Sequence, residues 1–279
     1  MSKPLAFIPE PKYIPVSITG AKCELNCLNC RGRYLKTMIP AKTPKRLKEV
    51  LLRHWLRGGY GALISGGFTR KGVLPISKEF IEVIKYVKKE TNLLISIHTG
   101  LISKELILEL YSADIDFIDF EVPPSNNFLR KVKNLMDHDV NMYIKTLQYM
   151  LTLRKDFAIP HIIIGNKYST SNEELRVLEE ISNLNPCMVT VLAEIHMHKG
   201  IEDLVTRVIN SLKHLRSIFR GEVTLGCMRP FKFKHLIDEL IISEGLVDRI
   251  ANPHPDAAKK FKLRTLNLCC SVPNLSKYI

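Results

Sequence analysis

Apolar and polar positions along the chain form a repeated unit, in which a short apolar run is followed by a polar turn and an amphipathic stretch. The apolar runs are continuous rather than alternating, as expected for parallel strands that are buried on both faces. Eight of these runs are predicted to be strands: residues 13–19, 60–65, 93–98, 116–122, 161–165, 188–193, 222–225 and 247–251.

Helix-start signals precede the amphipathic stretches between these strands. Thr43 and Pro44 are typical of an N-cap and the first residue of a helix. Ser171 and Glu174 have the spacing of a capping box. Further starts and helices are predicted at Ser77, at Ser103, in two pieces within 123–157, and at 202–219, 234–244 and 255–261.

Strands that alternate with helices in this way are typical of an α/β fold of the (β/α)8 TIM-barrel type, or of a near-complete variant. No linker or internal boundary is visible, so residues 1–263 are predicted to form one barrel domain. Residues 264–279 are expected to form a C-terminal tail over the active-site mouth.

Composition narrows the class of protein. The N-terminus has no apolar leader, and no apolar run approaches the length of a membrane span, so we expect a cytoplasmic protein with no membrane partner. The net charge of +13 favours an acidic, phosphorylated or nucleic-acid partner. The charge is spread along the helices and forms no basic arm, which argues against nucleic acid.

Three of the seven cysteines lie close together, as Cys23, Cys27 and Cys30 in a C-x3-C-x2-C pattern. They follow the first predicted strand, in a chain whose odd cysteine number does not fit a disulfide framework. A structural zinc ion needs four closed ligands. An iron–sulfur cluster held by only three thiolates leaves one iron open for a small molecule.

Polar residues and glycines gather where the other predicted strands end, which in barrels of this type is the edge that carries the chemistry. A turn after any strand favours such residues, so this enrichment alone is weak evidence. In chain order they are Ser65, Gly66, Gly67, His98, Glu121, Gly165, Glu194, His196, Cys227, Arg229 and Asn252.

The cysteine pattern, the Ser65-Gly66-Gly67 turn and the 162–165 segment together resemble the radical S-adenosylmethionine (radical SAM) superfamily. The resemblance implies a [4Fe-4S] cluster on Cys23, Cys27 and Cys30, with S-adenosyl-L-methionine on its open iron. It also implies that Ser65, Gly66 and Gly67 bind the methionine amino group and that Ile163 and Gly165 lie against the adenine.

Two other rim residues, Glu121 and His98, have two interpretations each. Glu121 could bind the ribose hydroxyls or be a paired interior carboxylate. His98 could act as an acid, a base or an adenine contact, or be hydrogen-bonded structure. Two departures stand out: Asn29 replaces the usual aromatic residue before the third cysteine, and Phe68 replaces the usual acidic residue after the glycines.

Segments 225–230 and 250–253, with Cys269 and Cys270, resemble the biotin synthase-like branch, and most of all the archaeal two-component lipoyl synthases. That branch implies sulfur insertion into an octanoyl chain on a lipoyl-carrier protein, a second radical SAM subunit and a reductant protein such as ferredoxin. It also implies a second [4Fe-4S] cluster, for which the candidate ligands are Cys227, Cys269 and Cys270.

Cys227 and Arg229 are the candidate catalytic residues. Cys227 could instead be a single substrate-facing thiol. The guanidinium of Arg229 suits a carboxylate of S-adenosylmethionine or substrate, or it could pair with a rim carboxylate such as Glu194. Three other functions stay open: biotin-type sulfur insertion or methyl transfer, RNA modification, and a non-enzymatic zinc-binding role.

Overall fold

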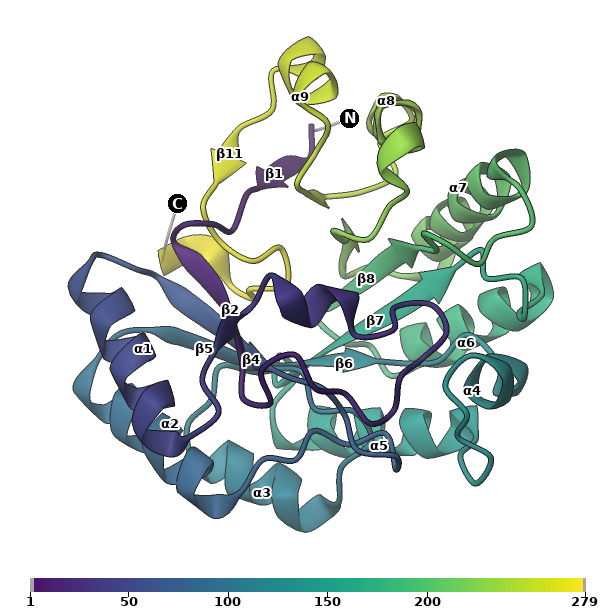
Figure 1. The fold of residues 1–279 in the computed structure, drawn as a ribbon. Helices are drawn as coiled ribbons and strands as arrows, with labels where there is room; N and C mark the ends of the chain where they lie inside the picture. The colour runs from purple at the N-terminus through teal and green to yellow at the C-terminus, as the bar shows by residue number, and fades with distance from the viewer. Residues whose placement is uncertain (1–2, 278–279) are drawn as a thin grey trace.

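The computed structural model describes residues 3–277. Eleven parallel strands form one curved sheet, and helices cover its outer face (Figure 1). In sheet order the strands are β11 (Thr265–Leu266), β1 (Leu5–Phe7), β10 (Arg249–Ala251), β9 (Glu222–Leu225), β8 (Met188–Ala193), β7 (Ala158–Ile164), β6 (Phe117–Glu121), β5 (Leu94–Ile97), β4 (Gly61–Ser65), β2 (Tyr13–Ser17) and β3 (Ile39–Pro40).

All eight predicted strands are present and are neighbours in the predicted order, so the α/β barrel prediction is confirmed. The barrel is a near-complete variant, because the sheet ends at β11 and β3 without a ladder that joins them. The short strands β1, β3 and β11 were not predicted. Each is only two or three residues long, too short to give a pattern in the sequence.

The helices are α1 (Pro44–Leu56), α2 (Lys78–Glu90), α3 (Lys104–Ser112), α4 (Asn126–Lys131), α5 (Val140–Leu153), α6 (Ser171–Asn183), α7 (Ile201–Ile218), α8 (Lys234–Ser243) and α9 (Pro255–Phe261). Thr43 caps α1 as predicted. The capping box of α6 lies one residue earlier than predicted, on Thr170 and Glu173. Glu174 instead turns inward and is fully buried.

Side chains alternate cleanly between the two faces of each strand, as pleating requires. Outward residues such as Ile64, Ile118 and Val191 pack against the helices in the main apolar cluster. Inward residues near the strand starts form a second cluster with the tail. Its members include Tyr13, Leu94, Phe117, Ile159, Met188, Leu268, Cys270, Val272 and Leu275.

The predicted position of the tail is wrong. Arg249, the first residue of β10, donates hydrogen bonds to the carbonyls of Cys270 (3.1 Å) and Val272 (2.6 Å). The segment 268–275 therefore fills the barrel interior toward the strand starts, inside the curve of the sheet (yellow in Figure 1). Its apolar side chains pack with inward residues near the strand starts, so it does not cover the opposite mouth.

Candidate functional site

The loop between β2 and β3 carries the three clustered cysteines, and the glycine turn after β4 holds it in place. A Cβ on Gly67 would lie 1.8 Å from the carbonyl oxygen of Lys22, so only glycine allows this approach. The amide of Gly67 donates to the Thr19 hydroxyl (2.6 Å). The Phe68 carbonyl accepts hydrogen bonds from the amides of Glu24 (2.9 Å) and Leu25 (3.0 Å).

The loop folds back on itself and brings its thiols toward one another. Cys27 and Cys30 interact through their thiols, and this interaction raises the pKa of Cys27 and lowers the pKa of Cys30. A Cβ on Gly32, two residues after Cys30, would lie 3.8 Å from the Cβ of Cys23. All three cysteines pack on the same apolar cluster. One loop therefore carries three soft ligands to the carboxyl end of the sheet, although their sulfur atoms do not all lie within 4.8 Å of one another.

The glycine turn keeps acceptors available beside these thiols. Ser65 is buried, and its carbonyl accepts a hydrogen bond from Ile18 (2.9 Å). Within residues 3–277, nothing donates to the carbonyls of Gly66 or Gly67. Phe68 stands where the family usually has an acidic residue. The centroid of its ring lies 5.1 Å from that of the His98 imidazole.

Glu121 is already paired, which favours the interpretation that it is an interior carboxylate with a structural partner over a role in ribose binding. Its carboxylate lies 2.7 Å from the Lys133 ammonium, and both side chains are largely buried. Burial opposes ionisation of Glu121, but Lys133 outweighs it and lowers the pKa of the carboxyl. Burial lowers the pKa of the nearby His98 imidazole, which favours the neutral ring.

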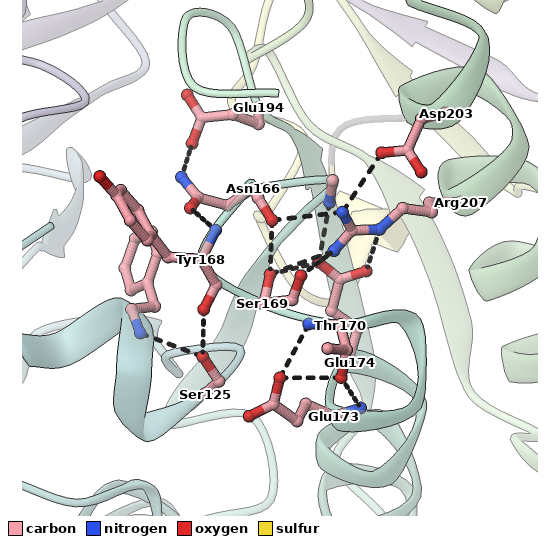
Figure 2. Close-up of polar contacts among 12 residues, drawn as sticks. Ser125, Asn166, Tyr168, Ser169, Thr170, Glu173, Glu174, Glu194, Asp203 and Arg207 are labelled. Atoms are coloured by element: carbon pink, nitrogen blue, oxygen red, sulfur yellow. Dashed lines mark hydrogen bonds and ion pairs between the residues drawn. The ribbon is translucent and has the colours of Figure 1, made fainter. Parts of the chain in front are cut away.

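The loop after β7 is rigidly built (Figure 2). Gly165 has a φ of +88°, and its amide donates to Glu174 (2.9 Å). Glu174 also pairs with the buried guanidinium of Arg207 at 2.5 Å. Beside Gly165, Ile163 points into the barrel and packs with Leu192 in a small apolar cluster. This apolar surface lies at the position where the adenine was expected.

The predicted role of Arg229 is wrong. Its side chain is fully buried and pairs with Asp238 of α8 at 2.7 Å. It also donates to the carbonyls of Gly226, Ala251 and Asn252. These bonds hold the loops after β9 and β10 together and leave no donor pointing into the site, so Arg229 is a positioning residue.

The alternative partner for Arg229, Glu194, is occupied elsewhere. Its carboxylate accepts a hydrogen bond from the Asn166 side chain (Figure 2). It also accepts hydrogen bonds from the amides of residues 195–197. The loop after β8 is thereby fixed against the loop after β7. The sequence placed Glu194 at the rim correctly, but no spacing rule indicated which donors it would meet.

Cys269 and Cys270 lie inside the barrel, and Cys227 is exposed in the loop after β9. A hydrogen bond from the Val272 amide to the Cys269 carbonyl (3.1 Å) closes a turn at the two adjacent cysteines. Cys227 is exposed, yet protein surrounds it closely enough that desolvation raises its pKa, with the nearby Cys269 thiol adding to the effect. Cys270 is buried in the second apolar cluster, near the strand starts. The turn removes the difficulty that adjacent side chains on an extended chain point apart.

A row of polar side chains that we did not predict lies deeper in the barrel. His161, Thr190 and Thr224 are register partners on β7, β8 and β9. We call these three residues the polar row. Asp119, two residues before Glu121 on β6, faces it. The signal was present in the sequence: a polar residue stands at an inward position in the middle of four apolar strands.

The mouth of the barrel is basic. A cavity of about 510 Å³ at the rim is lined by Leu28, Arg31, Arg33, Lys167, His196 and Met197. These residues come from the cysteine loop and from the loops after β7 and β8.

No helix among residues 3–277 is long and apolar enough to cross a membrane.

No protein-family model matches the sequence, and no curated protein matches it significantly. Solved structures do share the fold. Methylornithine synthase (PylB) has a TM-score of 0.55 and 14% identity over 91% of this chain and 73% of that chain. Coproporphyrinogen III oxidase (HemN) from Escherichia coli, a radical SAM enzyme, has a TM-score of 0.50 and 14% identity over 77% and 53%.

HMG-CoA lyase from Brucella melitensis is as similar in fold, with a TM-score of 0.56 and 12% identity over 90% of this chain and 81% of that chain. At such low identities the comparison shows the barrel and nothing more specific. The chemistry has to be argued from the side chains.

Proposed function

We propose that this protein is a radical SAM enzyme, with Cys23, Cys27 and Cys30 as the ligands of a [4Fe-4S] cluster and S-adenosyl-L-methionine as cosubstrate. The observation that carries the proposal is the cysteine loop folded onto Gly67, which places three cysteines of one loop against the same apolar cluster. When bound, the cluster and S-adenosylmethionine supply the 5′-deoxyadenosyl radical that removes hydrogen from an unactivated C–H bond.

The protein's own residues bind and orient the cosubstrate. The open carbonyls of Gly66 and Gly67 accept hydrogen bonds from the methionine ammonium. The apolar surface of Ile163 and Leu192 takes the adenine face. The near-complete barrel and the loops at its rim limit the access of water and other quenchers to the reacting atoms. With Glu121 paired to Lys133, ribose binding falls to other polar groups at the rim.

The test replaces one ligand and one matched cysteine outside the site. After anaerobic reconstitution, we expect Cys23→Ser to lose nearly all iron and all reductive cleavage of S-adenosylmethionine to 5′-deoxyadenosine. Cys187→Ser, at the opposite end of the barrel, should retain both. Full cleavage activity in Cys23→Ser contradicts the proposal, as does wild-type protein that binds zinc in place of iron.

We propose further that Cys227, Cys269 and Cys270 hold a second iron–sulfur cluster and that the reaction is sulfur insertion. The position of Cys269 and Cys270 inside the barrel, with Cys227 in the loop after β9, supports this. Iron and sulfide analysis tests it: Cys269→Ser should lose about half of the iron while still cleaving S-adenosylmethionine. Unchanged iron content would leave Cys227 as a single substrate-facing thiol.

An octanoyl chain on a lipoyl-carrier protein is a candidate substrate, favoured by the basic rim. Arg31, Arg33 and Lys167 would meet an acidic carrier, or a ferredoxin that supplies electrons, and a second radical SAM subunit could complete the assembly. Carrier binding should weaken steeply with salt and with Arg31→Glu. Binding of RNA in place of the carrier, with a similar salt dependence, would favour the RNA-modification alternative.

A further inference from the structure

Two imidazoles and a carboxylate lie together where α8 and α9 begin, after β9 and β10. The ligand atoms of His235, His254 and Asp256 all lie within 4.8 Å of one another. Among residues 3–277, no other three side chains of histidine, cysteine, aspartate or glutamate meet that distance. The centroids of the two imidazole rings are 4.9 Å apart. The fold therefore brings metal-binding side chains from two separate elements to one place.

The spacing of these atoms is close to that of a metal site. His254 Nδ1 lies 3.7 Å from Asp256 Oδ2. Two ligands of one tetrahedral zinc ion lie about 3.4 Å apart, because each bond is about 2.0–2.2 Å long. His235 and Asp256 are exposed. Small rotations of their side chains are therefore enough to close the remaining distance.

The contacts that these groups now make are weak. The amide of Asp256 donates to His254 Nδ1 at 3.3 Å, which is long for a hydrogen bond. The Asp256 carboxylate accepts no hydrogen bond from residues 3–277, and its one charged neighbour there is His254. Both groups are therefore open to a cation that approaches from the solvent.

The backbone beneath the group is held in place by contacts between α8 and the loop after β10. The amide of His254 donates to the buried carboxylate of Asp238 on α8 (2.7 Å). Lys234, which precedes His235, donates to the carbonyl of Asn252. The two elements are thus joined independently of any ion, so an ion would meet ligands that are already close together.

A second carboxylate lies beside His235. Glu239 is four residues later on α8, a spacing that places two side chains on the same face of a helix. Its Oε1 lies 3.1 Å from His235 Nε2, and its Oε2 lies 3.1 Å from the ammonium of Lys260. Histidines that bind metals are commonly oriented by such a carboxylate. Because Lys260 occupies its other oxygen, Glu239 is a positioning residue for His235 and not a ligand.

We propose that His235, His254 and Asp256 bind a zinc ion. Imidazole nitrogens and a carboxylate oxygen are usual zinc ligands, and three protein ligands leave a fourth position for water or another molecule. The bound ion would join the start of α9 to α8, the helix that follows the loop with Cys227. This site is separate from the cysteines and does not depend on the proposed radical SAM function.

The first test is a calorimetric titration of the anaerobically reconstituted protein with zinc chloride. The wild type should bind zinc, and His235→Ala should weaken the binding at least about 100-fold. The matched control is His214→Ala, because His214 also contacts a carboxylate, Glu179 at 2.9 Å, but has no part in the group. It should bind zinc as the wild type does. Absence of zinc binding in the wild type, or equal affinity in His235→Ala, overturns the inference.

The second test identifies the ligand atoms by X-ray absorption at the zinc edge. The zinc-loaded, reconstituted protein should show only nitrogen and oxygen neighbours, at about 2.0–2.2 Å. Sulfur neighbours at about 2.3 Å would place the ion on the cysteines and overturn the inference.

The zinc site and the proposed function fail separately. Retained iron and retained cleavage of S-adenosylmethionine in Cys23→Ser would contradict the proposed function and leave the loss of zinc binding in His235→Ala as it stands. Zinc affinity that falls in Cys23→Ser and is unchanged in His235→Ala would overturn the zinc site, whatever the result for cleavage.

Discussion

The two ends of the barrel interior differ sharply in chemistry. At the strand starts, Tyr13, Leu94, Phe117 and Met188 pack with the C-terminal tail into a sealed apolar cluster. At the strand ends the interior holds cysteines, glycines with open carbonyls and the paired Glu121. The contrast teaches that one end provides stability through apolar burial, and the other gives up part of that burial for a site.

We expect the largest effect from a substitution at Gly67. Gly67→Val places carbon atoms where the Lys22 carbonyl now lies, so the cysteine loop must move away. We expect iron loading and cleavage of S-adenosylmethionine to fall more than 100-fold, roughly a loss of 3 kcal/mol or more in transition-state stabilisation. The helical content should be unchanged.

The control for this variant is Gly200→Val, at a glycine where a Cβ would meet no atom within 4 Å. It should load iron normally. Normal loading in Gly67→Val would show that the close packing of the two loops is not needed to gather the thiols.

The opposite end should respond in stability and leave the chemistry intact. Phe117→Ala removes a fully buried ring from the lower cluster. We expect the free energy of unfolding to fall by about 3–5 kcal/mol, with the iron content per folded protein unchanged. Denaturant titration and iron analysis of the same sample measure both. Loss of iron without loss of stability would contradict the division of roles.

The smallest expected effect is on the stability of the fold at acidic pH. Because Lys133 holds the pKa of Glu121 below its ordinary value of 4.5, the pair contributes stability that is fully present above that pH. This contribution is lost as the pH falls through the lower folded-state value. Unfolding midpoints of the wild type should therefore decline more below pH 4.5 than those of a Glu121→Gln/Lys133→Met variant. Parallel declines would mean that the pair is not formed in solution.

Much of the fold could be predicted because the strands carry their signal locally. Each of the eight central strands is a mainly apolar run, four of them with an inward polar residue, and Thr43-Pro44 marks the start of α1. The tail could not be placed, because Leu268, Val272 and Leu275 acquire their meaning only from inward residues of distant strands. The short strand β1 forms between β10 and β11, and β11 pairs with β1 alone.

The site shows the same division between local and distant information. The spacing of Cys23, Cys27 and Cys30 is local and could be interpreted directly. The partner of Arg229 could not be predicted, because only tertiary packing decides whether Asp238 or Glu194 lies beside it. Asp119 was missed because its neighbour His161, 3.5 Å away, lies on a different strand and far along the chain.

The most direct test of the central claim is low-temperature electron paramagnetic resonance of the anaerobically reconstituted, dithionite-reduced protein. We expect the signal of a reduced [4Fe-4S] cluster that changes shape when S-adenosyl-L-methionine is added and is absent from Cys23→Ser. A reduced protein with no such signal, or one whose signal is unaffected by S-adenosylmethionine, would contradict the account.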